Sequence, residues 1–238
     1  MLEIYMTPLQ HNMNPLHFEN LLRLLPLSRQ DKIRKFTRRE DAYRSLTADI
    51  LSRWLICDYL GVANEELRIM QNAYGKPMLP GNEGLFFNHS HSGQWIVSAL
   101  SDAPVGIDIE QRSDIDLRIA DRFFSAQEVM DLREIPAEAR SDYFFELWTL
   151  KESYIKADGR GLSLPLSSFT IRKQRGHIQL DTENSFRSCF FKQYTPDPLY
   201  KMAVCALTSD FPETPRIIDF DELYKQFMCV NKMEHDRA

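Results

Sequence analysis

The stretch SDYFFELWTLKESYIKAD, residues 141–158, decides the fold, because it predicts the clearest helix of the chain. Its apolar side chains recur every three or four residues and so line one face of a helix. These side chains are Phe144, Leu147, Trp148, Tyr154 and Ile155. Gly159 follows directly, and a glycine at that position ends a helix. Strands are predicted after it at residues 168–173, 177–180, 187–194 and 200–208.

The first half of the chain repeats this order of elements. In both halves a helix is followed by a glycine, a Pro-containing segment, a pair of phenylalanines and a final apolar strand. The first helix is residues 40–60, the phenylalanines are residues 86–87 and 190–191, and the final strands are residues 95–101 and 202–209. The repeat predicts an α+β fold of two similar subdomains in a pseudo-twofold arrangement. Each would be a small, mostly antiparallel sheet packed with a long helix, with the active site in the cleft between them.

Shorter elements complete this prediction. Strands are predicted at residues 2–6, 85–87 and 106–110, and helices at residues 14–25, 28–39 and 125–134. Ser28 and Ser125 are predicted N-caps, and Glu128 completes a capping box with Ser125. We expect an N-terminal subdomain at residues 1–105, a C-terminal subdomain at residues 106–230 and a frayed tail at residues 231–238.

The composition is that of an ordinary globular protein of the cytoplasm. Hydrophobic residues make up 43% of the 238 residues and charged residues 26%. The net charge of −5 argues against a protein that coats nucleic acid, and no stretch approaches the ~18 apolar residues of a membrane span. The four cysteines are scattered without a CxxC pair, which excludes a zinc ribbon and favours a reducing compartment. The N-terminus lacks the basic start and apolar run of a signal peptide.

Two acids stand on one predicted strand, Gly106-Ile-Asp-Ile-Glu110. Side chains alternate along a strand, so Asp108 and Glu110 point to the same face. Two neighbouring carboxylates repel unless one is protonated or a cation lies between them. Carboxylate oxygens with open positions suit Mg²⁺, which takes the rest of its shell from water and phosphates. The alternative is a solvated strand face that happens to carry two acids.

A third acid lies on the helix at residues 141–158. Glu152 follows Trp148 by four residues, beside the apolar stripe, and a carboxylate directed toward a core needs a cation or hydrogen bonds. Lys156 is four residues further along the same face. The alternative is a simple Glu–Lys pair on the surface of the helix.

Two polar segments could receive phosphate groups. Residues 29–44 hold seven Lys or Arg against three acids, which suits a polyanion or else a solvated helix face. No nucleic-acid-binding pattern accompanies this basic tract. Asn88–Gly93 reads as a polar loop whose Ser, His and backbone N–H groups could cradle a phosphate. Lys76, held extended by Pro77, could add a cation. His89 and His91 alone supply too few ligands for a transition-metal site.

Taken together, these segments resemble the phosphopantetheinyl transferases, of the long, monomeric, surfactin-synthetase-activating type. The resemblance rests on five motifs in the order and spacing of that family, and it covers nearly the whole chain. The motifs are Gly75-Lys76-Pro77, Asn88-x-Ser90-His91-Ser92, Gly106-Ile-Asp108-Ile-Glu110, Phe124-Ser125-x-x-Glu128 and Trp148-x-x-Lys151-Glu152-x-x-x-Lys156.

The resemblance implies a magnesium-dependent transfer, with Mn²⁺ as a possible substitute. The phosphopantetheine arm of coenzyme A would move to a serine of an apo acyl- or peptidyl-carrier protein, releasing 3′,5′-ADP, as in antibiotic and nonribosomal peptide synthesis. Such an in-line attack on a diphosphate depends on positioning and charge neutralisation. The alternatives are a non-catalytic module that binds coenzyme A or a nucleotide, and a magnesium-dependent hydrolase.

Residue roles follow from the matched positions. Asp108, Glu110 and Glu152 resemble the metal ligands. The base for the carrier serine would be Glu152, a metal-bound water or Glu128. Lys156 and Lys151 would face the diphosphate, while further matched positions would hold the nucleotide and its phosphates. These are Arg29, Lys32, Ser45, Lys76, Ser90 and His91.

This chain departs from the family at one position, and the carrier surface is a separate hypothesis. His89 stands where the family usually has an apolar residue, and we expect it to be neutral and hydrogen-bonded if it points inward. Glu110 is not acidic throughout the wider family. The carrier is expected at residues 112–124, where Arg118 and Arg122 lie among apolar residues.

Overall fold

The computed structural model describes residues 1–174 and 177–231, and all but the first residue of the tail predicted at 231–238 lies outside this part. The N-terminal half contains α1 (Pro15–Arg23), α2 (Leu27–Arg34) and α3 (Arg39–Leu60). Its strands are β1 (Leu2–Pro8), β2 (Met70–Gln71), β3 (Pro77–Met78), β4 (Phe86–Ser92) and β5 (Trp95–Ser101). No described helix is long and apolar enough to cross a membrane.

The C-terminal half begins with β6 (Val105–Gln111) and continues through α4 (Ala120–Phe123), α5 (Ala126–Glu134) and the long helix α6 (Arg140–Asp158). Its further strands are β7 (Thr170–Gln174), β8 (His177–Asp181), β9 (Phe190–Tyr194) and β10 (Tyr200–Ala206). The last described elements are β11 (Arg216–Ile217) and α7 (Phe220–Val230). Short 3₁₀ turns at Leu117–Ile119, Ala137–Ala139, Gly161–Ser163 and Leu166–Ser168 connect these elements.

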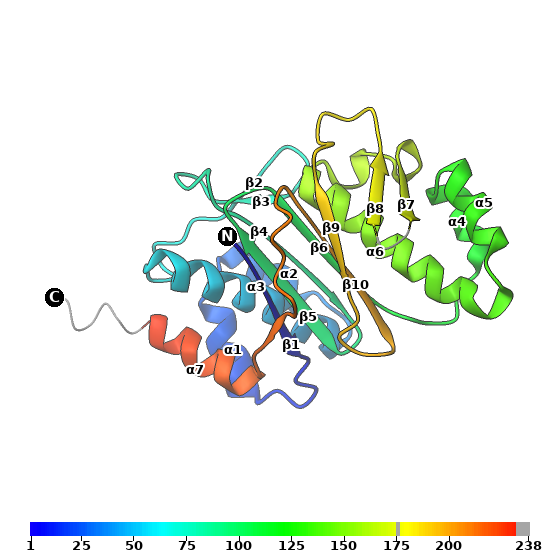
Figure 1. Ribbon diagram of the computed structural model, residues 1–238. Helices are drawn as coiled ribbons and strands as arrows, with labels where there is room; N and C mark the ends of the chain where they lie inside the picture. Colours follow the sequence, from blue (N-terminus) through cyan, green and yellow to red (C-terminus); the bar gives the residue numbers. More distant parts are fainter. Residues whose placement is uncertain (175–176, 232–238) are drawn as a thin grey trace.

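The two halves repeat one arrangement, as Figure 1 shows. In the first, strands β1, β5 and β4 lie side by side in that order, all antiparallel, and α3 packs on them. In the second, strands β6, β10 and β9 take the same order and α6 packs on them. Each half is therefore a strand, a long helix and a hairpin. The predicted α+β fold of two similar subdomains is confirmed.

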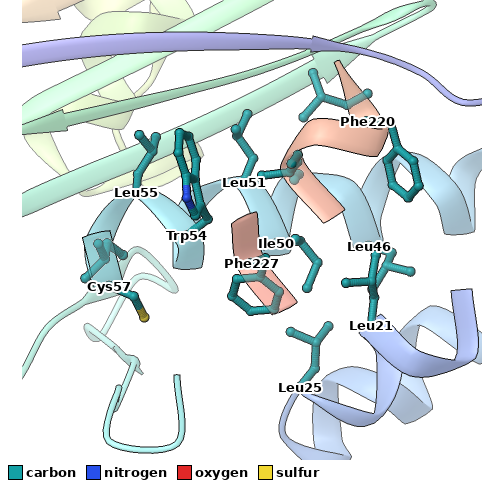
Figure 2. Packing of buried hydrophobic residues seen from close by; sticks show 14 of the residues in the cluster. Leu21, Leu25, Leu46, Ile50, Leu51, Trp54, Leu55, Cys57, Phe220 and Phe227 are labelled. Carbon is teal, nitrogen blue, oxygen red and sulfur yellow. The ribbon is translucent and has the colours of Figure 1, made fainter. Parts of the chain in front are cut away.

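The C-terminal segment returns to the N-terminal half. β11 pairs in parallel with β1, and α7 packs against α3. Figure 2 shows the apolar core that results, with Phe220 and Phe227 of α7 facing Ile50 and its neighbours on α3. Burial of one such side chain contributes about 1.5–3 kcal/mol. The sequence patterns did not predict β11 or α7.

Two local predictions were wrong. Asn88–Gly93 is not a polar loop, since its first five residues belong to β4. Ser28 is not the N-cap of α2, because the helix begins after Pro26 with no side-chain cap. The capping box of Ser125 and Glu128 is confirmed at the start of α5.

Candidate active site between the two halves

The two sheets meet along β4 and β6, which lie side by side without forming a backbone ladder. Side chains of β4 supply the hydrogen bonds instead. Ser90 Oγ donates to Asp108 Oδ1 at 2.9 Å, and Ser92 Oγ donates to Glu110 Oε2 at 3.0 Å. Asn88 Oδ1 accepts from the backbone N–H of Ile107 at 2.9 Å. The backbone of β4 pairs with β5, and its polar side chains bond the second half of the molecule, which explains why a strand at this position is so polar.

Helix α6 lies directly on β6. A Cβ placed on Gly106 would come within 2.1 Å of the backbone oxygen of Ser153, so only glycine permits this approach. The close packing brings Lys156 of α6 onto the strand. Its Nζ lies 2.6 Å from Asp108 Oδ1, 3.0 Å from Ser90 Oγ and 3.2 Å from the backbone oxygen of Ile107.

The predicted acids converge at this point. Asp108 is 3% exposed, and its second oxygen, Oδ2, is buried with no hydrogen-bond partner among the described residues. Burial, followed by the charge of Asp108, raises the pKa of Glu110 to about 7. The same two causes raise the pKa of Glu152 above its ordinary value. Lys156 pairs with Asp108 and not with Glu152, its neighbour four residues back.

The site is therefore short of positive charge. Among the described residues, three carboxyl groups interact with one another and with one ammonium group, that of Lys156, and burial and the charge of Asp108 raise the pKa of Glu110 and of Glu152. Within residues 1–174 and 177–231, no three His, Cys, Asp or Glu side chains stand close enough to enclose a metal ion on their own. Any ion here would need further oxygen ligands from water or a substrate.

A second polar cluster lies between α2, α3 and β4. Arg29 donates from Nε and Nη2 to Asp49 Oδ2, at 2.9 and 2.6 Å, and from Nη2 to Ser45 Oγ at 3.3 Å. Lys32 is exposed on α2, one turn beyond Arg29. His91 is exposed on β4. The predicted phosphate-binding residues Arg29, Lys32 and Ser45 are thus neighbours, and the sequence patterns missed Asp49.

Lys76 occupies a different place from the one expected of a phosphate ligand. Its Nζ donates to the backbone oxygens of Ala157 at 3.0 Å and Val105 at 3.2 Å, and so joins the end of α6 to the start of β6. Burial lowers its pKa to about 8. A mostly apolar cavity of about 530 Å³ opens beside Lys76, with walls from both halves, including Phe86 and Phe186.

Glu128 and Lys151 are not part of this site. Both side chains are fully buried and form an ion pair of 2.7 Å. Glu128 also accepts from the backbone N–H groups of Ser125 and Ile171, and Lys151 donates to the backbone oxygen of Phe169. The pair joins α5 and α6 to β7. Because neither side chain is accessible, the structure contradicts the predicted role of Glu128 as a base and of Lys151 as a phosphate contact.

Comparisons with known proteins agree with these motifs. The sequence pattern of the 4′-phosphopantetheinyl transferase superfamily matches residues 104–206, and that of the 4′-phosphopantetheinyl transferase N-terminal region matches residues 11–102. The chain is 41% identical to 4′-phosphopantetheinyl transferase Sfp of Bacillus subtilis (strain 168), over 86% of this chain and 92% of the relative. It is 38% identical to 4′-phosphopantetheinyl transferase gsp of Aneurinibacillus migulanus, over 76% of each chain.

A solved structure is also similar in part. It is a holo-(acyl-carrier-protein) synthase from Bacillus anthracis str. Ames in complex with CoA (3′,5′-ADP). The TM-score is 0.40 at 19% identity, and the match covers 45% of this chain and 97% of that one.

Proposed function

This chain belongs to the 4′-phosphopantetheinyl transferase family, and from that premise we propose that it transfers the 4′-phosphopantetheine arm of coenzyme A to a serine of an apo carrier protein. The observation that carries the proposal is the meeting of Asp108, Glu110 and Glu152 with Lys156 between the two halves. Since one chain supplies both sides of this site, we propose that it acts as a monomer.

The acids fit a hard divalent cation. The buried Oδ2 of Asp108 has no hydrogen-bond partner among the described residues, and an added positive charge would reduce the repulsion between the carboxyls of Glu110 and Glu152 and that of Asp108. Carboxylate oxygens are preferred by Mg²⁺, and Mn²⁺ accepts them too. Asp108, Glu110 and Glu152 would hold the ion together with oxygen atoms of water or substrate, because the three side chains do not enclose an ion by themselves, and the ion when bound would neutralise charge on a diphosphate.

The chain's own groups would perform the remaining steps. Lys156 and Ser90 orient the diphosphate, because their Nζ and Oγ already lie together at Asp108. Glu152 accepts the proton of the carrier serine, since it is the carboxyl of α6 that faces Asp108 and Lys156. The serine oxygen then bonds to the β-phosphorus, the bond from that phosphorus to the bridging oxygen breaks, and 3′,5′-ADP leaves.

The nucleotide would lie toward α2 and α3. Arg29 donates to Ser45, and with the exposed side chains of Lys32 on α2 and His91 on β4 these residues suit the 3′-phosphate. Asp49 already holds the Arg29 guanidinium by two hydrogen bonds, which orients it before any ligand arrives. Lys76 supports the site by fixing α6 to β6, since its ammonium group is occupied by backbone oxygens.

The carrier would bind at residues 112–124. This segment has half-buried apolar residues, but its three arginines are matched by three aspartates. Arg118 is paired with Asp116 at 2.6 Å. Arg122 forms no ion pair with a described residue, and its Cζ lies 5.2 Å from the centre of the Phe123 ring, over the ring face. Arg122 is thus the better candidate for meeting an acidic carrier.

One assay separates transfer from its alternatives. The protein is incubated with coenzyme A, Mg²⁺ and a panel of apo carrier domains, and each carrier is weighed by mass spectrometry. Transfer adds about 340 Da to the carrier and releases 3′,5′-ADP. Nucleotide release without the mass gain would instead indicate a hydrolase. Binding of coenzyme A with neither change, across the whole panel, would indicate a non-catalytic module.

A further inference from the structure

Glu110 has two neighbours that could each hold its carboxyl group, because its strand β6 lies between β4 and β10. On the β4 side, Ser92 Oγ donates to Glu110 Oε2 at 3.0 Å and accepts from the backbone N–H of Gln111 at 3.0 Å. On the β10 side, Lys201 lies directly opposite Glu110 in the antiparallel register. Opposite side chains share one face of the sheet, with Cβ atoms about 4.5–5.5 Å apart. A lysine at position 201 is therefore long enough to pair with Glu110.

Lys201 pairs with two acids of α6 instead. Its Nζ lies 2.6 Å from Asp142 Oδ2 and 2.9 Å from Glu146 Oε1, and its side chain is 12% exposed. Asp142 and Glu146 are four residues apart, so they lie on one face of the helix, which packs on β10. Among the described residues, Glu110 accepts a hydrogen bond from Ser92 alone and forms no ion pair. The lysine opposite Glu110 is thus directed away from it.

Further ion pairs hold the two acids in place. Asp142 Oδ1 accepts from Arg112 Nη1 at 2.6 Å, through the oxygen that Lys201 does not contact. Glu146 Oε2 pairs with Lys173, again through the oxygen that Lys201 does not contact. Each carboxylate is therefore oriented by a second cation. Lys201 would lose two charge-assisted hydrogen bonds if it turned to another acid.

This arrangement keeps positive charge away from Glu110. The charges that act most on Glu110 are those of Asp108, Lys156 and Glu152, and two of these three are negative. An ammonium bonded to Glu110 would neutralise the carboxylate and would repel a divalent cation at the same place. The hydroxyl of Ser92 holds the carboxyl without adding charge.

We propose that Asp142 and Glu146 are positioning residues for the divalent cation, because they hold Lys201 away from Glu110 and so keep this carboxyl available to the ion. The inference rests on the proposed function, since it takes an ion at Asp108, Glu110 and Glu152. Without the two acids, Lys201 turns to Glu110 and competes with the ion.

The test measures the affinity of the protein alone for Mn²⁺, by electron paramagnetic resonance of the free ion, without coenzyme A or carrier. In the double variant Asp142→Asn/Glu146→Gln, we expect the affinity for Mn²⁺ to fall about tenfold. Adding Lys201→Met to this variant should restore most of the affinity, because the competing ammonium is gone. In a metal-free crystal structure of the double variant, Lys201 Nζ should lie within hydrogen-bond distance of Glu110.

A cycle with Glu110→Gln separates this contact from the mere loss of two negative charges near the ion. If the two acids act through Glu110, their replacement should weaken Mn²⁺ binding about tenfold in the wild type and about twofold or less in Glu110→Gln. Equal weakening in both backgrounds, or none in a folded double variant, would overturn the inference. Failure of the wild type to bind Mn²⁺ would overturn it too.

The remaining outcomes are also decisive. If the double variant does not fold, Glu146→Gln alone leaves the pair of Arg112 and Asp142 intact, and the same cycle should then show a smaller loss that depends on Glu110. If the cycle behaves as expected but no carrier gains mass, the proposed transfer fails and the inference about the ion stands.

Discussion

Replacing Glu110 with glutamine should stabilise the protein in the absence of divalent ions. Glu110 is one of three carboxyls around a single ammonium, and burial and the charge of Asp108 raise its pKa from 4.5 to about 7. A glutamine keeps the shape and can still accept the hydrogen bond from Ser92, but it carries no charge. The variant therefore removes the repulsion and leaves the packing in place.

The magnitude and its pH window follow from the two pKa values. Below pH 4.5 the carboxyl is protonated in both the folded and the unfolded protein and contributes nothing. As the pH rises toward 7, the unfolded chain loses the proton first, so the wild type loses free energy of unfolding. Above pH 7 that loss amounts to about 3 kcal/mol. For a chain of this length it corresponds to roughly 6–12 °C in Tm.

Denaturant unfolding of both proteins at pH 5 and pH 8, with EDTA, measures this effect. The free energy of unfolding of Glu110→Gln should exceed that of the wild type by about 3 kcal/mol at pH 8 and by about 1 kcal/mol at pH 5. Glu65→Gln, at an exposed position, is the matched control and should show no such difference. If the difference in free energy of unfolding between Glu110→Gln and the wild type does not grow with pH, the electrostatic explanation is refuted. Added Mg²⁺ should then stabilise the wild type more than it stabilises Glu110→Gln. Equal stabilisation of the two proteins would show that Glu110 is not a metal ligand.

The remaining predictions concern activity, folding and the carrier. Asp108→Asn and Glu152→Gln should each lower kcat by two or more orders of magnitude in the carrier mass assay while the protein stays folded; near-normal turnover would exclude these acids from catalysis. Lys151→Met should destabilise the protein by about 3–5 kcal/mol in denaturant unfolding, because Glu128 is left buried without its partner, and adding Glu128→Gln should recover part of the loss. Arg122→Glu should raise the KM for an apo carrier more than Arg118→Glu, whose arginine Asp116 already pairs; unchanged values in both would place the carrier elsewhere.

The buried pair of Glu128 and Lys151 shows a limit of motif reasoning. Both residues lie within motifs of the family, and the capping box that includes Glu128 is readable from the spacing of Ser125 and Glu128. The local sequence does not predict that Lys151 pairs with Glu128 or that the backbone N–H of Ile171 in β7 donates to Glu128. Burial depends on elements that are distant in the chain, so accessibility had to come from the structure.

The sequence by itself determined the repeated order of strand, helix and hairpin, together with the acids, lysines and glycines of the site. These are local properties, since helix periodicity, caps and the alternation of a strand involve residues within a few positions of one another. Tertiary structure alone decided what the polar side chains of Asn88–Ser92 bond to, because the partners of Ser90 and Asn88 belong to β6, whereas the backbone of this strand pairs with the neighbouring β5. It also decided that β11 and α7 return to β1 and α3, and that His89 faces α3. Such long-range contacts form because polar groups still need hydrogen-bond partners and apolar surfaces still need burial once the local elements have formed. They cannot be predicted from a short stretch of sequence, because no such stretch contains both partners.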